Sequence, residues 1–164
     1  MSRANTAPIV AAILLSAWLG AAVFFSAIVA PAAFRALPDP SMAGTLVRAT
    51  LPAILYAGMV VGIVSAWLGS SGTSLFARGV RTACAAGVAL CSVVAEFVAV
   101  ERIERLRARL TTPIESLASN DPVRMTFGRL HALSVGLLGL AMILAIVAVV
   151  LSCQAALASS VSPE

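Results

Sequence analysis

Charged and titratable side chains are scarce in this chain, so those beside apolar segments are the ones whose chemistry needs an explanation. Glu96 lies about one turn inside an apolar segment, and Arg129 and His131 stand just before another. A carboxylate inside such a segment is costly unless it faces a polar partner. We therefore predict that Glu96 pairs with Arg129, and that Arg35, Arg48 and His131 lie at the same end of the protein.

This predicted polar cluster has three interpretations, which differ in what the charges are for. The first is a structural ion pair that fixes the register of two helices. The second is a binding site for an anionic headgroup, a proton or a small solute. The third is simple extension of the side chains to the membrane surface. The cluster is defined by Arg35, Arg48, Glu96, Arg129 and His131.

The remaining chemistry-bearing residues do not form a recognisable catalytic or metal-binding pattern. His131 is the single histidine, so a zinc site is not expected, although it could bind a haem or pigment from one side. We expect a capping or hydrogen-bonding role for it. Cys84, Cys91 and Cys153 are expected as apolar thiols, with a Cys84–Cys153 bridge as the alternative. Since no Gly-rich phosphate loop, HExxH or GxSxG occurs, we expect no enzyme, no catalytic residue and no cofactor.

Composition places these residues in a membrane protein. Apolar residues make up 60% of the 164 residues, charged residues make up 11%, and the mean hydropathy is +1.02. In soluble globular chains, roughly 45–50% of the residues are apolar and about 25% are charged. Each long uncharged segment is long enough to form one transmembrane helix, which needs about 20 residues. We predict one all-α domain over residues 1–164, an integral membrane four-helix bundle with spans near 9–30, 52–70, 80–100 and 132–154. The first span is too long for a signal peptide, so we expect it to be retained.

The arginines predict the orientation of these spans. All eleven basic residues are arginine, and eight of them fall in the connections 31–51 and 101–131. The positive-inside rule therefore places both connections in the cytoplasm and both termini outside, in a bacterial inner membrane. Because orientation already accounts for the basic charge, no nucleic-acid partner is expected.

The connection over residues 101–131 is predicted to be a helical hairpin that extends helices three and four into the cytoplasm. Leu106 and Leu110 continue an apolar stripe beyond the third span, and Val123, Phe127 and Leu130 offer a matching stripe on the fourth helix. Thr112 to Glu115 has the capping-box pattern for a short helix, and Asp121-Pro122 starts the fourth helix. Asp39-Pro40-Ser41 likewise supplies turn and cap residues before the second helix. The hairpin is expected to be either a self-packed, solvated helix pair or a docking surface for a partner.

Small residues predict how the spans pack. Gly58 and Gly62 form a GxxxG pair, while Gly87 and Gly136 belong to similarly spaced sets on the third and fourth helices. Small residues allow two helix backbones to approach closely, so a compact bundle is expected.

Several short motifs resemble a widespread bacterial membrane domain of unknown function, whose human relative is transmembrane protein 205. They cover most of the chain except the third helix. They are Ala17-Trp18-Leu19-Gly20, Phe24-Phe25, Ala30-Pro31-Ala32-Ala33-Phe34-Arg35, Ala43-Gly44 leading to Leu51-Pro52, and Phe127-Gly128-Arg129-Leu130-His131-Ala132-Leu133-Ser134. The resemblance implies a four-helix membrane protein without established enzymatic activity.

Two functions are open at this point. One is a membrane protein of the transmembrane-protein-205-like type that binds a small solute or a lipid headgroup at its cytoplasmic mouth. The other is a structural accessory subunit of a larger respiratory or photosynthetic membrane complex. Four short helices are expected to enclose little volume, which favours a homo-oligomer or a subunit over a lone transporter. Membrane lipid is the one partner common to both.

Overall fold

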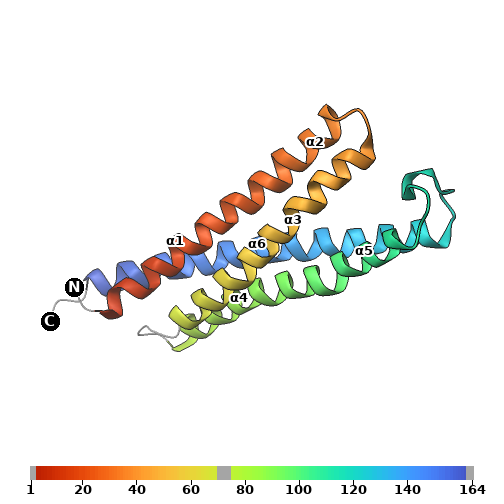
Figure 1. Ribbon diagram of the computed structural model, residues 1–164. Coiled ribbons are helices and arrows are strands. Elements are labelled where there is room, and N and C mark those ends of the chain that lie inside the picture. The colour runs from red at the N-terminus through yellow and green to blue at the C-terminus, as the bar shows by residue number, and fades with distance from the viewer. Residues whose placement is uncertain (1–2, 70–74, 162–164) are drawn as a thin grey trace.

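The chain folds into four long helical rods joined by short connections (Figure 1). The computed structural model describes residues 3–69 and 75–161. Over these residues it contains helices and no strands, and four of the rods are long and apolar enough to cross a membrane. The elements are α1 (Arg3–Phe24), η1 (Phe25–Val29), α2 (Ala30–Ala36), α3 (Pro40–Leu68), α4 (Leu75–Val94), η2 (Ala95–Val100), α5 (Glu101–Ala108), η3 (Ile114–Ser116) and α6 (Pro122–Val161). The all-α, four-helix prediction is confirmed.

Two of the rods begin at Asp-Pro pairs, as their sequences predict. Asp39 accepts hydrogen bonds from the backbone N–H of Ser41 at 2.9 Å and from its hydroxyl at 2.6 Å, and α3 starts at Pro40. These bonds hold the pKa of the Asp39 carboxyl below its ordinary value. Asp121 accepts from the N–H of Val123 at 2.7 Å, and α6 starts at Pro122. Each aspartate supplies an acceptor to a helix end that would otherwise leave N–H groups unpaired.

Two rods contain a π-helical segment that the hydrophobic pattern does not predict. In η1 the N–H of Ala30 donates to the carbonyl of Phe25, five residues earlier. Pro31 follows directly and has no N–H, so the wider turn lets the rod continue past a residue that breaks regular α-helical bonding. The second π segment, η2, joins α4 to α5 and contains Glu96. A π turn holds an extra residue, which rotates the side chains on its two sides relative to one another.

The rods pack most closely where glycine meets a neighbouring backbone. A Cβ on Gly62 would lie 2.6 Å from the amide nitrogen of Ala89 and 2.8 Å from the carbonyl oxygen of Ala85, so α3 and α4 are in direct backbone contact. Gly58 makes room for the ring of Trp18, whose indole N–H donates to the carbonyl of Ile54 at 2.9 Å. The prediction of close packing at these two glycines is confirmed. On α6, by contrast, Gly136 is exposed with open space around its Cα.

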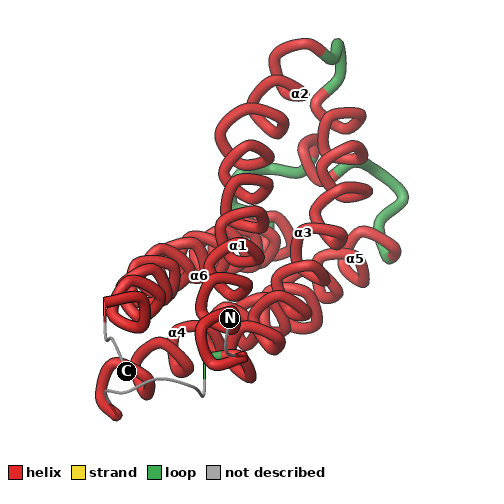
Figure 2. The backbone as a smooth tube through the Cα atoms, turned by 90° about the vertical axis from the view of Figure 1, so that its left-hand side faces the viewer, coloured by secondary structure: helices red, strands yellow, loops and turns green. Residues whose placement is uncertain are grey.

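The first hairpin, which runs from α1 to α3, diverges from the second hairpin, which runs from α4 to α6. Figures 1 and 2 show α2 and the beginning of α3 rising away from α5 and α6, whereas α1, α3, α4 and α6 lie together nearer the chain termini. The packed region buries an apolar core that includes Leu15, Trp18, Leu55 and Val88. The bundle is therefore closed near the termini and open at the opposite end.

The third rod, formed by α4, η2 and α5, and the fourth rod, α6, are both longer than one membrane crossing requires. The 40 residues of α6 correspond to about 60 Å, twice the roughly 30 Å of a bilayer core. The connection between α5 and α6 is tied to the start of α6, because Ile114 is buried and Arg124 donates to the carbonyl of Leu117 at 2.6 Å. The short helix predicted to start at the capping box of residues 112–115 is only a 3₁₀ turn without a side-chain cap. The turn ends at Leu117, whose backbone is extended at ψ 151°.

Candidate functional site

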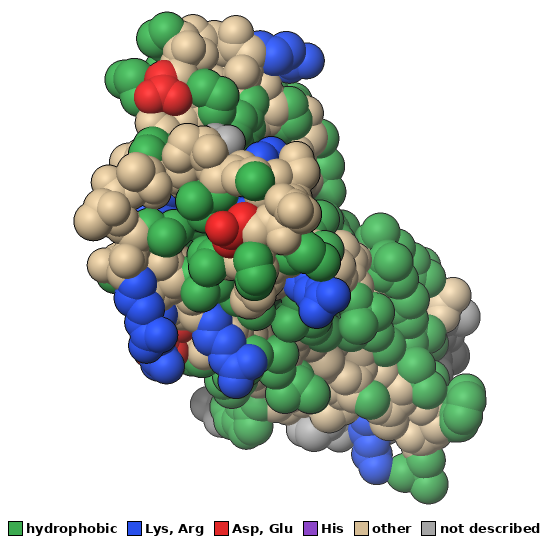
Figure 3. Space-filling view, turned by 90° about the vertical axis from the view of Figure 1, so that its right-hand side faces the viewer, with side chains coloured by type: hydrophobic (Ala, Val, Ile, Leu, Met, Phe, Trp, Pro, Cys, Tyr) green, Lys and Arg blue, Asp and Glu red, His purple; other side chains and the backbone are tan. Residues whose placement is uncertain are grey.

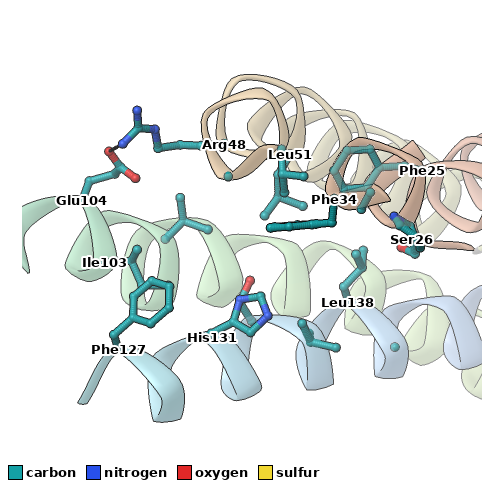
Figure 4. A pocket seen from close by; sticks show the side chains of 18 of the residues that line it. Phe25, Ser26, Phe34, Arg48, Leu51, Ile103, Glu104, Phe127, His131 and Leu138 are labelled. Atoms are coloured by element: carbon teal, nitrogen blue, oxygen red, sulfur yellow. Dashed lines mark hydrogen bonds and ion pairs between the residues drawn. The ribbon is translucent and has the colours of Figure 1, made fainter. Parts of the chain in front are cut away.

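A cavity of about 470 Å³ lies between the two hairpins, at the level where they begin to diverge (Figure 4). All four rods contribute to its wall. Most of the wall is apolar, with the aromatic rings of Phe25, Phe34 and Phe127 among aliphatic side chains such as Leu51 and Leu138. We call this the inter-hairpin cavity. Its presence corrects the expectation that four short helices enclose little volume, because the two hairpins diverge from one another.

The two π segments border this cavity and shape it. Phe25 and Ser26 reach it from η1, and Val100 reaches it from the last residue of η2. Phe34 lies on α2, which directly follows η1, so its direction depends on the change of helical register that η1 introduces. π segments are frequent at functional sites because they redirect side chains without ending the helix.

The mouth of the cavity carries an ion pair between the two hairpins. Arg48 of α3 and Glu104 of α5 approach to 3.4 Å, although 56 residues separate them in the sequence. Both side chains are about two-fifths exposed, at 39% and 41%. Pairs this exposed contribute only about 0–1 kcal/mol, so this one closes the mouth weakly and can open at small cost.

A second set of polar and aromatic groups lies beside this ion pair. The guanidinium carbon of Arg107 is 5.0 Å from the ring centroid of Phe127, within cation–π range. The Phe127 ring stacks on the His131 ring, with centroids 6.1 Å apart and planes 12° from parallel. The guanidinium group also reaches α3, where it comes within 3.9 Å of the position of a Cβ on Gly44. Arg107 therefore crosses the mouth from one hairpin to the other.

Away from the mouth, the cavity wall contains two serines. Ser134 is 6% exposed, and the hydroxyl of Ser26 is buried without a hydrogen-bond partner among the described residues. The carbonyl of Ser26 also lacks its helical partner. In π-helical bonding it would accept from the N–H of residue 31, five residues later, but Pro31 has no N–H. A buried hydroxyl without a partner costs roughly 1–3 kcal/mol. A ligand with a polar group could remove that cost.

The structure brings together only part of the predicted polar cluster. Arg48 and His131 line the cavity, whereas Arg35 and Arg129 are exposed and do not line it. The predicted Glu96–Arg129 ion pair is not among the ion pairs of the described residues. Glu96 instead interacts with the hydroxyl of Tyr56 on α3. The prediction placed Arg129 at the same depth as Glu96. Leu106 and Leu130 line one groove, however, so Arg129 lies at the level of Arg105, about two turns beyond Glu96 along the rod.

Sequence reasoning also missed residues that the structure places in important positions. Glu104 and Arg107 belong to an arginine-rich segment that looks like a solvated helix face, and only α3 and α6 give them a role. Arg81, at the start of the third predicted span, received no role, but it lies on α4, is 3% exposed and donates to the carbonyl of Gly69 at 2.7 Å. There it closes the C-terminal end of α3. The three cysteines are free, and Cys91 is buried as expected.

Four apolar rods of spanning length and a cavity between two hairpins define a four-helix membrane protein. No group of three or more metal-ligating side chains occurs within residues 3–69 and 75–161. The chain belongs to the family described as Domain of unknown function (DUF4149), whose profile matches residues 13–111. That match runs from the middle of α1 to just beyond α5 and stops before α6, which supplies Phe127 and His131 to the cavity. No match was found among curated proteins or among solved structures.

Proposed function

We propose that this protein binds a small amphipathic molecule in the inter-hairpin cavity. The observation that carries the proposal is a cavity of about 470 Å³ whose wall is apolar and whose polar groups gather at the mouth. Ligand sites typically have volumes of about 300–1,000 Å³ and a few polar groups that orient the ligand. The apolar part of the molecule lies among Phe25, Phe34 and Leu138, and its polar end lies near Arg48 and His131.

The ion pair at the mouth supports a site that opens and closes. A ligand that enters between the hairpins has only to separate Arg48 from Glu104 and to move Arg107 aside. Ser26 offers a hydrogen bond to a ligand group that reaches further in. The proposed activity is therefore binding without catalysis, either for carriage of the molecule or for sensing it.

The proposed setting is a bacterial inner membrane, with the mouth at the cytoplasmic side. The arginines support this orientation, because eight of the eleven lie in the connections at the mouth end of the bundle. The resemblance of the first-helix and fourth-helix motifs to transmembrane protein 205 supports placing this chain with uncharacterised multi-span membrane proteins of that type.

Two glycines of α6 provide a matched test of cavity binding. Gly139 lines the cavity and Gly136 is exposed on the same helix, and neither has an atom within 4 Å of its Cβ position. Gly139→Leu therefore fills the cavity without a backbone clash, while Gly136→Leu adds the same side chain outside it. Binding of a fluorescent single-chain amphiphile to the purified protein should weaken at least about tenfold in Gly139→Leu and stay within twofold of wild type in Gly136→Leu. Equal binding by both variants would show that the probe does not occupy the cavity.

A structural role in a larger assembly or a homo-oligomer is the second candidate. It is favoured by the exposed small residues Ala132 and Gly136 on α6, which suit close approach by another helix. Native mass measurement after mild detergent extraction tests it. A larger stable species that Gly136→Leu dissociates would support this role, and a monomer in both proteins would remove it.

A further inference from the structure

We propose that a second site, outside the inter-hairpin cavity, binds the phosphate-bearing headgroup of an anionic membrane phospholipid. The site is a groove of about 190 Å³ between α5 and α6, which we call the basic groove. Arg102, Arg105 and Arg109 form one side of it, and Leu106, Thr126 and Leu130 complete it. Three guanidinium groups beside two leucines are complementary to a lipid, which has a charged phosphate above an apolar chain.

Arg102 and Arg105 lie on α5, and Arg109 directly follows its last residue, Ala108. Their spacing of three and four residues places all three on one side of the helix, and all three side chains are exposed. Arg105 is already paired with Glu101 one turn earlier on the same helix. Arg102 and Arg109 have no acidic partner among the described side chains, so the groove keeps a net positive charge.

The position of the groove along the rods selects a lipid as the occupant. On the second hairpin, Phe97 and Leu133 are 52% and 42% exposed, as expected of side chains that face lipid tails. Within about two turns on each rod, the exposed side chains become Arg102 and Arg129. Both rods thus change from apolar to cationic surface at similar levels, which is where phosphate groups border the hydrocarbon core. Figure 3 views this end of the molecule, where the arginines gather, with an apolar flank running behind them.

Removal of two arginines from the groove tests the proposal. The full-length protein in neutral detergent is titrated with phosphatidylglycerol and with phosphatidylcholine of the same acyl chains, and bound lipid is counted by native mass spectrometry. Wild type should retain phosphatidylglycerol preferentially. Arg102→Gln/Arg109→Gln should weaken its binding by about 25-fold, at about fivefold for each of the two arginines lost. Phosphatidylcholine binding should remain unchanged.

The control variant carries the same change of net charge elsewhere. Arg35→Gln/Arg78→Gln removes two arginines outside the groove and should leave the phosphatidylglycerol preference within about twofold of wild type. An equal loss in both variants would overturn the proposal, because net charge alone would then explain the preference. Competition by millimolar inorganic phosphate would also overturn it, since it would identify a site for free anions. Gly139→Leu should bind phosphatidylglycerol like wild type, which separates the basic groove from the inter-hairpin cavity.

Discussion

Gly62 is the residue on which the contact between α3 and α4 depends most directly. Its Cα lies so close to α4 that an added Cβ would meet backbone atoms of Ala85 and Ala89 at less than 3 Å. A flexible side chain could move aside, but a helix backbone cannot do so without displacing the whole rod. In a membrane, where lipid tails are as apolar as the side chains, this close contact is what stabilises the helix pair.

We expect Gly62→Ala to destabilise the bundle by about 1–3 kcal/mol, the usual cost of overpacking. The measurement is the midpoint of unfolding in mixed micelles with increasing sodium dodecyl sulfate. Gly79→Ala is the matched control, because Gly79 is also helical but has nothing within 4 Å of its Cβ position. Alanine has a higher helix propensity than glycine, so Gly79→Ala should unfold no earlier than wild type. If it unfolds as early as Gly62→Ala, contact with α4 is not the cause of the loss.

At the scale of elements, α5 and α6 form a projection whose packing rests on few contacts. Leu106 and Leu130 line the same groove between the two helices, which supports the predicted contact between their apolar stripes. The connection is attached by the buried Ile114 and by the bond from Arg124 to the Leu117 carbonyl. Residues 118–120 are exposed and lie in no helix, so they are the most accessible backbone of the projection.

Limited digestion with a protease of broad specificity should therefore cut first near residues 116–120 and leave α5 intact. Leu106→Asp should make α5 the next site of cleavage, because it places a charge against Leu130. Met125→Asp, at an exposed position of α6, should leave the pattern unchanged. Early cleavage throughout α5 in the wild-type protein would contradict the packed projection and would favour a partner that orders it.

At the scale of the whole molecule, one end of the bundle is open and carries most of the charge. The opening, the ion pair between Arg48 and Glu104 and the basic groove all lie at this end, opposite the chain termini (Figure 1). If the arginines set the orientation, this end faces the cytoplasm and ligands enter from that side.

Cysteine labelling in intact cells tests the orientation. In a background where Cys84, Cys91 and Cys153 are replaced by alanine, Ser2→Cys should react with a membrane-impermeant maleimide added outside. Asn120→Cys, in the exposed connection before α6, should react only after lysis. The reverse pattern would place the open end outside the cell and would require an extracytoplasmic source for any ligand.

The sequence by itself determined the number of rods and where several of them begin. Uncharged segments long enough for one crossing predicted four helices, and Asp39-Pro40 and Asp121-Pro122 predicted two helix starts, because capping depends on neighbouring residues only. Gly58 and Gly62 predicted close packing for the same reason, since small size is a property of the residue itself.

Only the tertiary structure decided which polar groups meet. Glu96 was paired with Arg129 on the assumption that both lie at one depth on antiparallel rods, but Arg129 lies level with Arg105, and Glu96 lies beside Tyr56 instead. Arg48 and Glu104 are brought together by the angle between two hairpins, which no local pattern encodes. The inter-hairpin cavity has the same origin: its volume depends on how far packed rods diverge, and that divergence is the net result of contacts distributed along all four rods.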